Sequence, residues 1–285
     1  MFISDKWKDY KIIDAGGGEK LERWGSAIVV RPDPQAIWPR TKPDAAWQRC
    51  HMHYHRSKSG GGRWEHQKKA PSGEGWTINY GDAVFNIKPT DFKHMGLFPE
   101  QADNWEWVMG LIKKPVRVLN LFGYTGGATV CCLKAGAEVT HVDAAKGMNQ
   151  WAKDNIKSSG LNDRVCRIMT DDVYKFVQRE QRRGSYYDGI IMDPPSYGRG
   201  PSGEVWKLEN RLYDLVRNCT QILSKEPLFM LLNTYTTGFT AIAAENVMKL
   251  ALAGNGGNFS SGPLGLPIGD TGLILPCGTT VRWQA

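Results

Sequence analysis

The sequence contains no long hydrophobic run and no CxxC motif, and each absence excludes a class of protein. No segment reaches the roughly eighteen consecutive apolar residues from which a membrane-spanning helix is built. The amino terminus lacks the pattern of a signal peptide. The six cysteines are spaced as reduced thiols and not as a metal or redox motif. We therefore expect a cytoplasmic protein with no membrane partner.

The 285 residues suffice for one large domain, or for a core domain with an extension, and they show no internal repeat. The formal net charge is +7, and the chain carries eleven Trp residues. This composition indicates an anionic partner, with nucleic acid as the first candidate. A surplus of positive charge that serves only solubility would give the same numbers.

Most of the surplus charge lies in residues 40–69, which contain eight Lys or Arg against two acids. Four aromatic residues punctuate this basic segment, namely Trp38, Trp47, Tyr54 and Trp64. Basic residues with interleaved aromatics suit phosphate contacts combined with base stacking. A solvated hairpin whose aromatic side chains cover the core is an equally good interpretation.

Three histidines in the same segment, His51, His53 and His55, alternate along a predicted strand and so share one face. A metal site would need a further ligand that the sequence does not identify, so we predict no metal. Residues 57–62 are predicted to form a flexible loop, because they consist largely of glycine and serine.

Short β elements dominate the first part of the chain. Strands are predicted over residues 10–38, separated by turns at residues 16–18 and at Gly25, and a hairpin is predicted over residues 76–88. A helix is then expected at about residues 99–113, with proline at its start.

An apolar run at residues 116–121 breaks into a glycine turn and resumes as a helical pattern that ends at Gly136. Gly123, Gly126 and Gly127 permit a tight turn and a close approach of the backbone to a ligand. Such a turn alone fits nucleotide binding and plain packing equally well.

The next predicted strand, residues 138–143, ends in Asp143. It lies about twenty residues after the turn, where an acid of a doubly wound fold accepts hydrogen bonds from ribose hydroxyls. A helix over residues 144–158, closed by Gly160, is expected to follow. This acid shifts the interpretation of the turn towards nucleotide binding.

The third predicted strand, residues 165–170, leads into Asp171 and Asp172. An acid at this position could accept a hydrogen bond from an adenine amino group. It could equally cap the helix predicted over residues 173–182, and one of the pair could do each job.

The fourth predicted strand, residues 187–193, ends in Asp193 and is followed by Pro194 and Pro195. The two prolines predict a rigid loop, residues 194–200, at the carboxyl end of the strand, where ligands of open α/β sheets bind. The sequence therefore predicts a ligand site at the edge where these strands end.

The remaining predicted elements are a helix at residues 204–224, a strand at 227–232 and a helix at 240–253. The tail is predicted to end in a hairpin whose arms are residues 273–276 and 280–283.

This order of glycine turn and acidic strand ends resembles the class I S-adenosylmethionine-dependent methyltransferases. The turn lacks the full GxGxxG of a dehydrogenase, and Asp-Pro-Pro after the fourth strand is a methyltransferase feature. More narrowly, the chain resembles the bacterial 23S ribosomal-RNA large-subunit base methyltransferases, a family that includes cytosine-5 enzymes. The motifs that carry this resemblance are residues 96–101, 119–127, 172–176 and 191–195, and the similarity covers about residues 92–240.

The resemblance implies a Rossmann-like, doubly wound, mostly parallel seven-stranded sheet in a methyltransferase domain over residues 91–285. It leaves residues 1–90 as a small β-rich amino-terminal extension. S-adenosylmethionine is the implied cofactor. The residues expected to bind it are Gln101, Asn120, Phe122, Gly123, Tyr124, Thr125, Gly126, Gly127, Asp143, Asp171, Asp172 and Asp193.

Within that set, the resemblance places the turn near the methionine moiety, Asp143 at the ribose, Asp172 with help from Asp171 at the adenine, and Gln101 over the cofactor. The residues expected to position the methyl acceptor are Asp193, Pro194, Pro195 and Tyr197.

One departure from the family pattern changes the expected chemistry. Cytosine-5 methylation needs a cysteine that adds to the ring, and the family's cysteine would fall near Thr236, in the loop 233–238. Threonine does not supply a thiolate-like nucleophile, so we predict a methyltransferase without a cysteine nucleophile. Cys277 could fold back as a substitute, but we interpret it as a buried structural thiol.

Methyl transfer to a ring or exocyclic nitrogen needs no covalent step. Tyr197 would then stack a flipped base, although Ser196 separates it from the prolines and loosens the match to an amino-methylating loop. The function that these observations favour is methylation of a base of ribosomal RNA.

Two other functions stay open, because residues 1–90 show no RNA-binding module of the kind common in those relatives. One is a methyltransferase for a small molecule or a protein, with residues 38–69 as a lid over the acceptor. The other is a non-catalytic module that binds S-adenosylmethionine or RNA. Residues 10–38 also offer a strand edge at which a homodimer could form.

Overall fold

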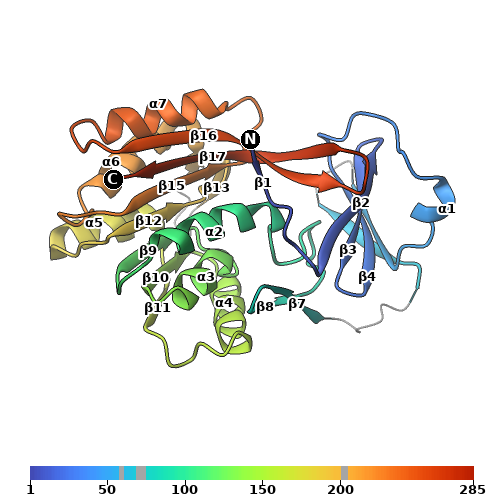
Figure 1. Ribbon diagram of the computed structural model, residues 1–285, viewed down its shortest axis with the longest axis horizontal. Coiled ribbons are helices and arrows are strands. Elements are labelled where there is room, and N and C mark those ends of the chain that lie inside the picture. Colours follow the sequence, from blue (N-terminus) through green and yellow to red (C-terminus); the bar gives the residue numbers. More distant parts are fainter. Residues whose placement is uncertain (58–60, 69–74, 200–204) are drawn as a thin grey trace. The chain divides into compact units, whose positions relative to one another are not determined.

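The structure is a computed structural model that describes residues 1–57, 61–68, 75–199 and 205–285. The chain divides into two compact units (Figure 1). The first consists of residues 1–2, 103–264 and 278–285, and the second of residues 3–102 and 265–277. No helix among the described residues is long and apolar enough to cross a membrane.

A mostly parallel sheet forms the centre of the first unit, with strand order β11-β10-β9-β12-β15-β17-β16. Five of its strands are mutually parallel. They are β9 (Arg117–Leu121), β10 (Glu138–Asp143), β11 (Cys166–Thr170), β12 (Gly189–Met192) and β15 (Phe229–Thr234). β17 (Leu273–Gln284) lies antiparallel to β15, and β16 (Asn258–Ile268) lies beyond it. The predicted doubly wound, mostly parallel sheet is confirmed.

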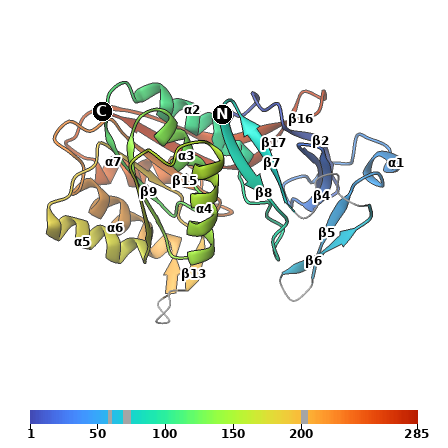
Figure 2. The ribbon, with the colours of Figure 1, turned by 90° about the horizontal axis from the view of Figure 1, so that it is seen from below.

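Helices cover both faces of this sheet (Figures 1 and 2). On one face lie α2 (Ala102–Leu111), α3 (Gly127–Lys134) and α4 (Lys146–Ser158). On the other lie α5 (Val173–Arg183), α6 (Leu208–Thr220) and α7 (Ala241–Ala251). Glycines with left-handed φ end α3, α4 and α5, as the sequence predicts for the first two.

The strands of a sheet covered on both faces are apolar on both sides. In β9, Leu119 and Leu121 belong to the core under α5, α6 and α7. The side chain between them, Asn120, faces the other way and donates to Thr129 of α3 at 2.9 Å. Alternation along one strand therefore puts an amide under the turn that follows it.

The second unit is built from short strands, as predicted. β2 (Tyr10–Gly16), β3 (Glu19–Trp24) and β4 (Ala27–Pro32) form an antiparallel meander. Its turns use left-handed φ at Gly17, Gly18 and Gly25. The remaining elements are β1 (Phe2–Ile3), β5 (Met52–Arg56), β6 (Gly62–His66), β7 (Trp76–Tyr80), β8 (Ala83–Ile87), the helix α1 (Asp44–Trp47) and the 3-10 turn η1 (Pro99–Gln101).

The predicted hairpin in the tail is wrong, because its two expected arms are not separate strands. Residues 273–276 and 280–283 both lie in the single strand β17, which pairs with β16 on one side and with β15 on the other. The turn between these strands uses left-handed φ at Gly269 and Gly272. Gly278, which lies between the two predicted arms, is within β17, and a Cβ there would come 2.9 Å from the ring of Tyr235. Close packing, and not a turn, explains that glycine.

Two further predictions need correction around Asp193. The loop at residues 194–200 contains a strand, β13 (Tyr197–Arg199), which pairs with β14 (Val205–Lys207). The helix predicted at residues 204–224 therefore starts only at Leu208, because β14 precedes it. Residue 200 and residues 201–204 lie outside the described residues, as do residues 58–60 of the predicted flexible loop.

A buried ion pair joins two strands of the meander. Arg31 donates to both carboxylate oxygens of Glu22, at 2.6 and 2.7 Å, and both side chains are almost fully buried. Tyr10 donates to the same carboxylate at 2.7 Å. Burial would raise the pKa of Glu22, but the charges of Arg31 and Lys20 and the hydrogen bonds from Arg31 and Tyr10 together outweigh it and lower that pKa to about 2.

We expect Glu22→Leu to lower the free energy of unfolding by about 3–5 kcal/mol, because it leaves the Arg31 charge buried and unpaired. Glu22→Leu with Arg31→Met should recover most of this loss. The control Asp270→Asn breaks only the exposed pair with Lys11 and should change stability by less than about 1 kcal/mol.

Urea unfolding measures these differences. The folded pKa of Glu22 lies below its ordinary value, so its contribution is complete above about pH 4.5 and is lost as pH falls towards 2. Equal losses for the single and the double variant would contradict this account.

Candidate functional site

The turn that follows β9 holds two non-glycine residues in left-handed backbone conformations, Phe122 at φ 56° and Tyr124 at φ 51°. Such φ values are uncommon for bulky residues and persist only where the surroundings hold them. The sequence suggested that glycines provide this freedom, but only Gly126, at φ 82°, has a left-handed φ among the three glycines of the turn. The turn is therefore strained and externally supported.

Gly123 is required for space and not for its φ. A Cβ at this position would lie 2.3–2.9 Å from the imidazole of His141, which sits directly beneath it. Gly126 is also tightly placed, since its Cβ would come 3.0 Å from that of Ala152 in α4. The inner side of the turn is thus filled by His141 and Ala152.

Asp143 supports the turn from the end of the neighbouring strand. One carboxylate oxygen accepts from the backbone N–H of Tyr124 at 2.9 Å, and the other from that of Ala145 at 2.8 Å. Burial raises the pKa of this carboxyl group, while the two backbone hydrogen bonds act in the opposite direction. Each carboxylate oxygen can accept a second hydrogen bond, so this contact does not exhaust the acceptor capacity of the group.

A chain of buried polar groups underlies the turn. Asn120 donates to Thr129, whose hydroxyl lies 2.8 Å from Nδ1 of His141. Burial lowers the pKa of His141 to about 4, so the ring is neutral near pH 7. From α4, Asn155 donates to the carbonyl of Thr125 at 2.8 Å. Sequence reasoning missed His141 and Asn155, since neither lies in a recognisable motif.

The two acids after β11 have different partners. Asp172 is the N-cap of α5 and accepts from the backbone N–H of Lys175 at 2.8 Å. Asp171 pairs with the guanidinium of Arg179. The structure thus gives the capping role, which the sequence left open between them, to Asp172. Their contact with adenine stays a prediction.

Asn149 ties the ends of two strands together. Its side-chain amide donates to the carbonyl of Asp143 at 2.9 Å and to the hydroxyl of Thr170 at 2.8 Å. This residue, which the sequence did not single out, is almost fully buried. It aligns the ends of β10 and β11, and with them Asp143 and Asp171.

The loop after β12 carries Asp193, which is half-buried, then Pro194 and Pro195. The carbonyl of Pro195 accepts from the indole N–H of Trp206, in β14, at 2.6 Å. The ring of Trp206 lies 5.7 Å from that of Phe122, centre to centre. Trp206 therefore contacts both this loop and the glycine turn, and the sequence gave no signal for it.

The same loop is also tied to the end of β15. Thr236, at the position where a nucleophilic cysteine would be needed, donates through its hydroxyl to that of Ser196 at 2.6 Å. Tyr197 follows and is half exposed, as a stacking platform requires. These contacts bring the predicted acceptor loop and the 233–238 loop together in the first unit.

Gln101 belongs to the second unit, where it ends the turn η1 and is largely buried. Its predicted place over the cofactor stays a prediction. Cys277 also belongs to the second unit. Burial raises the pKa of its thiol well above the ordinary value, which suits the structural interpretation.

The aromatic residues of the basic segment are engaged within the second unit. Trp47 and Tyr54 are buried. The half-buried Trp38 and Trp64 donate their indole N–H groups to the backbone carbonyls of Ala15 and Thr90, both at 2.7 Å. This arrangement favours core packing over base stacking.

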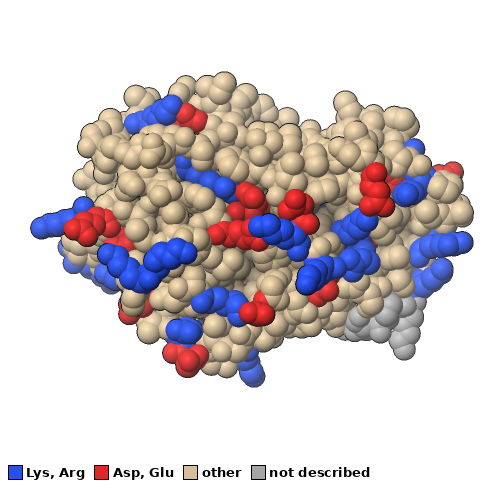
Figure 3. Space-filling view, in the orientation of Figure 1, with Lys and Arg blue, Asp and Glu red and all other residues tan. Residues whose placement is uncertain are grey.

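The described positively charged side chains of the segment are exposed, in contrast to its aromatic side chains. All six of the described Lys and Arg residues are exposed, namely Arg40, Lys42, Arg49, Arg56, Arg63 and Lys68, while Lys58 and Lys69 lie outside the described residues. On the face shown in Figure 3, Lys and Arg are interspersed with Asp and Glu. The segment can therefore offer scattered phosphate contacts.

Each of the three histidines has its own partner within the second unit. His53 pairs with Glu19 and His55 with Glu65, each at 2.7 Å, and Nδ1 of His51 accepts from the backbone N–H of Ile28. Across the described part of the chain, no group of three potential ligands could hold a metal ion.

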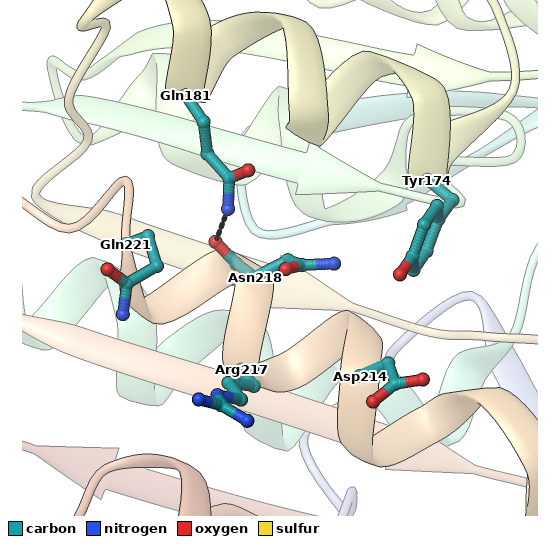
Figure 4. Close-up of a pocket in the computed structure, with 6 residues that line it drawn as sticks. All are labelled: Tyr174, Gln181, Asp214, Arg217, Asn218 and Gln221. Carbon is teal, nitrogen blue, oxygen red and sulfur yellow. Dashed lines mark hydrogen bonds between the residues drawn. The ribbon is translucent and has the colours of Figure 1, made fainter.

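A separate hollow of about 720 Å³ lies between α5 and α6 (Figure 4). It is open and mostly polar, and Gln181 donates across it to the carbonyl of Asn218 at 2.8 Å. Its other lining residues are Tyr174, Asp214, Arg217 and Gln221. None of the six belongs to the strand-end loops.

We expect Gly123→Ala to destabilise the first unit by about 1–3 kcal/mol, because the new methyl group overlaps the His141 ring. His141→Ala opens that space but also lowers the stability of the first unit by itself. The double variant should therefore lose less stability than the sum of the two single losses. Strict additivity in urea unfolding would show that the two residues do not compete for space.

A family model described as S-adenosylmethionine-dependent methyltransferase matches residues 41–247. The crystal structure of a SAM-dependent methyltransferase from Agrobacterium tumefaciens shares 40% sequence identity and a TM-score of 0.95. That match covers 99% of this chain and 92% of the other.

Two curated relatives are ribosomal RNA large subunit methyltransferases by name. Methyltransferase K/L of Syntrophotalea carbinolica is 29% identical over 176 residues, which is 61% of this chain and 24% of that protein. Methyltransferase K of Neisseria meningitidis is 23% identical over 220 residues, which is 75% of this chain and 62% of that protein. The chain thus spans less than two thirds of either relative.

The family model covers well over half of the chain, and the matched region contains the glycine turn, Asp143 and the Asp193 loop. The structure places these elements at the carboxyl ends of adjacent parallel strands, where the fold binds ligands. The chain belongs to the family of S-adenosylmethionine-dependent methyltransferases.

Proposed function

We propose that the chain methylates a base of ribosomal RNA, and that it does so without a cysteine nucleophile. The observation that carries the second part is the hydroxyl pair of Thr236 and Ser196 beside the Asp193 loop. The first part is supported by the names of the curated relatives, which are ribosomal RNA methyltransferases.

The residues at the strand ends fit S-adenosylmethionine. His141 and Ala152 fill the inner side of the turn, so its backbone approaches a ligand only from the outer side. The carboxylate of Asp143 keeps acceptor capacity for the ribose hydroxyls, because each oxygen uses one hydrogen bond on the backbone. We propose that residues 120–127 hold the methionine moiety and that Asp171 and Asp172 border the adenine.

The sulfonium of the cofactor carries an already activated methyl group. The contribution of the chain is therefore alignment of the acceptor and exclusion of water. We propose that Asp193 and the carbonyl of Pro194 orient an acceptor nitrogen, and that Tyr197 stacks on the flipped base. A ring or exocyclic nitrogen attacks directly, so no protein nucleophile is required.

The cysteines support this choice. Cys131 and Cys219 are fully buried in the first unit, and burial raises the pKa of both thiols far above the ordinary value. Such thiols are poor nucleophiles near neutral pH. Cys166, whose pKa burial raises to about 11, is equally unsuited.

Residues 38–69 are proposed as an accessory segment that contacts RNA through charge and not through stacking. Its aromatics are engaged in packing, whereas Arg49, Arg56 and Lys68 are exposed. A small-molecule or protein acceptor is the second candidate, with this segment as a lid. Homodimer formation through the edge of residues 10–38 is a separate proposal.

We expect Asp143→Ala to weaken S-adenosylmethionine binding by about 1.5–3 kcal/mol, the value of a hydrogen bond to a charged group. Isothermal calorimetry gives the affinity, and Asp143→Asn should fall between the wild type and the alanine variant. The control Asp154→Ala removes an exposed carboxylate of α4 and should leave the affinity unchanged. Unchanged affinity in Asp143→Ala would refute our placement of the ribose.

Labelled methyl groups should pass from S-adenosylmethionine to large-subunit ribosomal RNA extracted from cells that lack the gene. Nucleoside analysis should then show an N-methylated base and no 5-methylcytosine. Transfer should also weaken steeply between low and moderate salt, since phosphate contacts release counterions. Transfer only to metabolites or protein, without this salt dependence, would favour the second candidate.

A further inference from the structure

We propose that Trp206 is a positioning residue that fixes the acceptor loop, residues 193–197, relative to the glycine turn. This inference rests on the proposed function of the strand-end edge and names a residue that the function needs. Trp206 lies in β14, outside every motif that the sequence analysis used.

The acceptor loop needs a donor from elsewhere in the chain. Pro194 and Pro195 have no backbone N–H, so this stretch cannot bind itself to a neighbouring strand through donors of its own. The indole N–H of Trp206 meets the need by donating to the carbonyl of Pro195 at 2.6 Å. Gly198 lies beside both residues, since a Cβ on it would make ordinary van der Waals contacts with Trp206 and Pro195, at 3.7 and 3.9 Å.

The other end of the connection is the first residue of the glycine turn. The rings of Trp206 and Phe122 lie 5.7 Å apart at an interplanar angle of 53°. Both side chains pack on the core under α5, α6 and α7. Phe122 holds a left-handed φ, so its ring position and the path of the turn depend on each other.

Two further contacts hold the next residue, Ser196, and define what Trp206 adds. The backbone N–H of Leu208 donates to the carbonyl of Ser196 at 3.1 Å, and Thr236 donates to its hydroxyl. These contacts fasten the loop to α6 and to the end of β15. Trp206 fastens it to the turn, which is the part of the site proposed to hold the methyl donor.

The consequence is a link between the donor side and the acceptor side of the site. Methyl transfer depends steeply on the alignment of the reacting atoms. A loop that has lost its connection to the turn should disturb Phe122, which Trp206 contacts, and leave the other cofactor residues in place. Loss of Trp206 should therefore lower kcat much more than it lowers the affinity for S-adenosylmethionine.

The test compares Trp206→Phe, which keeps a ring against Phe122 but removes the indole N–H, with Trp206→Ala, which removes both. Trp76→Phe is the matched control, because Trp76 is also half-buried and also donates its indole N–H to a backbone carbonyl, that of Trp24 at 2.9 Å. It lies in the second unit, outside the basic segment.

On large-subunit ribosomal RNA from cells lacking the gene, kcat should fall roughly three- to tenfold for Trp206→Phe, the equivalent of one hydrogen bond. For Trp206→Ala it should fall about a hundredfold. Calorimetric affinity for S-adenosylmethionine should fall by a smaller factor, and Trp76→Phe should match the wild type. Equal falls in kcat and affinity, or an unchanged kcat, would overturn the proposal.

Amide hydrogen exchange provides a readout that needs no RNA. Addition of S-adenosylmethionine should slow exchange at residues 196–199 and 206–212 in the wild type and in Trp76→Phe, but not in Trp206→Phe. If the wild type methylates no RNA and this difference persists, the RNA function fails and the role of Trp206 stands. If the cofactor slows exchange equally in all three proteins, the role of Trp206 is wrong.

Discussion

Asp143 ends one strand of the sheet and accepts a hydrogen bond from the backbone N–H of Tyr124, in the turn that follows the neighbouring strand. Because Tyr124 and Phe122 both hold left-handed φ, the turn keeps its shape only while something outside it supplies contacts. Asp143 supplies a hydrogen bond, and the His141 ring under Gly123 packs against the inner side of the turn. The carboxylate thus serves the fold and, in our proposal, the ribose as well.

Most of the features that could be predicted from the sequence lie at the ends of strands. The alternation of strands and helices, the glycine turn and the acids at positions 143, 172 and 193 all belong to local patterns with a known place in a doubly wound sheet. The parallel order of β9, β10, β11 and β12 followed from them. The tail hairpin was predicted wrongly because both of its expected arms belong to one long strand, and no local pattern distinguishes a glycine that permits close packing, such as Gly278 between them, from a turn glycine.

The parts of the site that could not be predicted depend on contacts between residues far apart in the chain. His141 is an ordinary strand residue until the fold places Gly123 above it. Trp206 becomes part of the site only because β14 returns to the Asp193 loop. The basic segment shows the same limit of prediction. Its sequence does not tell that the aromatic side chains are packed and the charged ones exposed, because this depends on the folded structure.

The central claim is that one edge of the first unit, formed by residues 120–127, Asp143 and the Asp193 loop, holds the methyl donor next to its acceptor. A crystal structure with S-adenosylhomocysteine tests this claim most directly. We expect the ribose hydroxyls on the Asp143 carboxylate and the amino-acid end against the 122–127 backbone. A ligand bound elsewhere, for example between α5 and α6, would contradict the account.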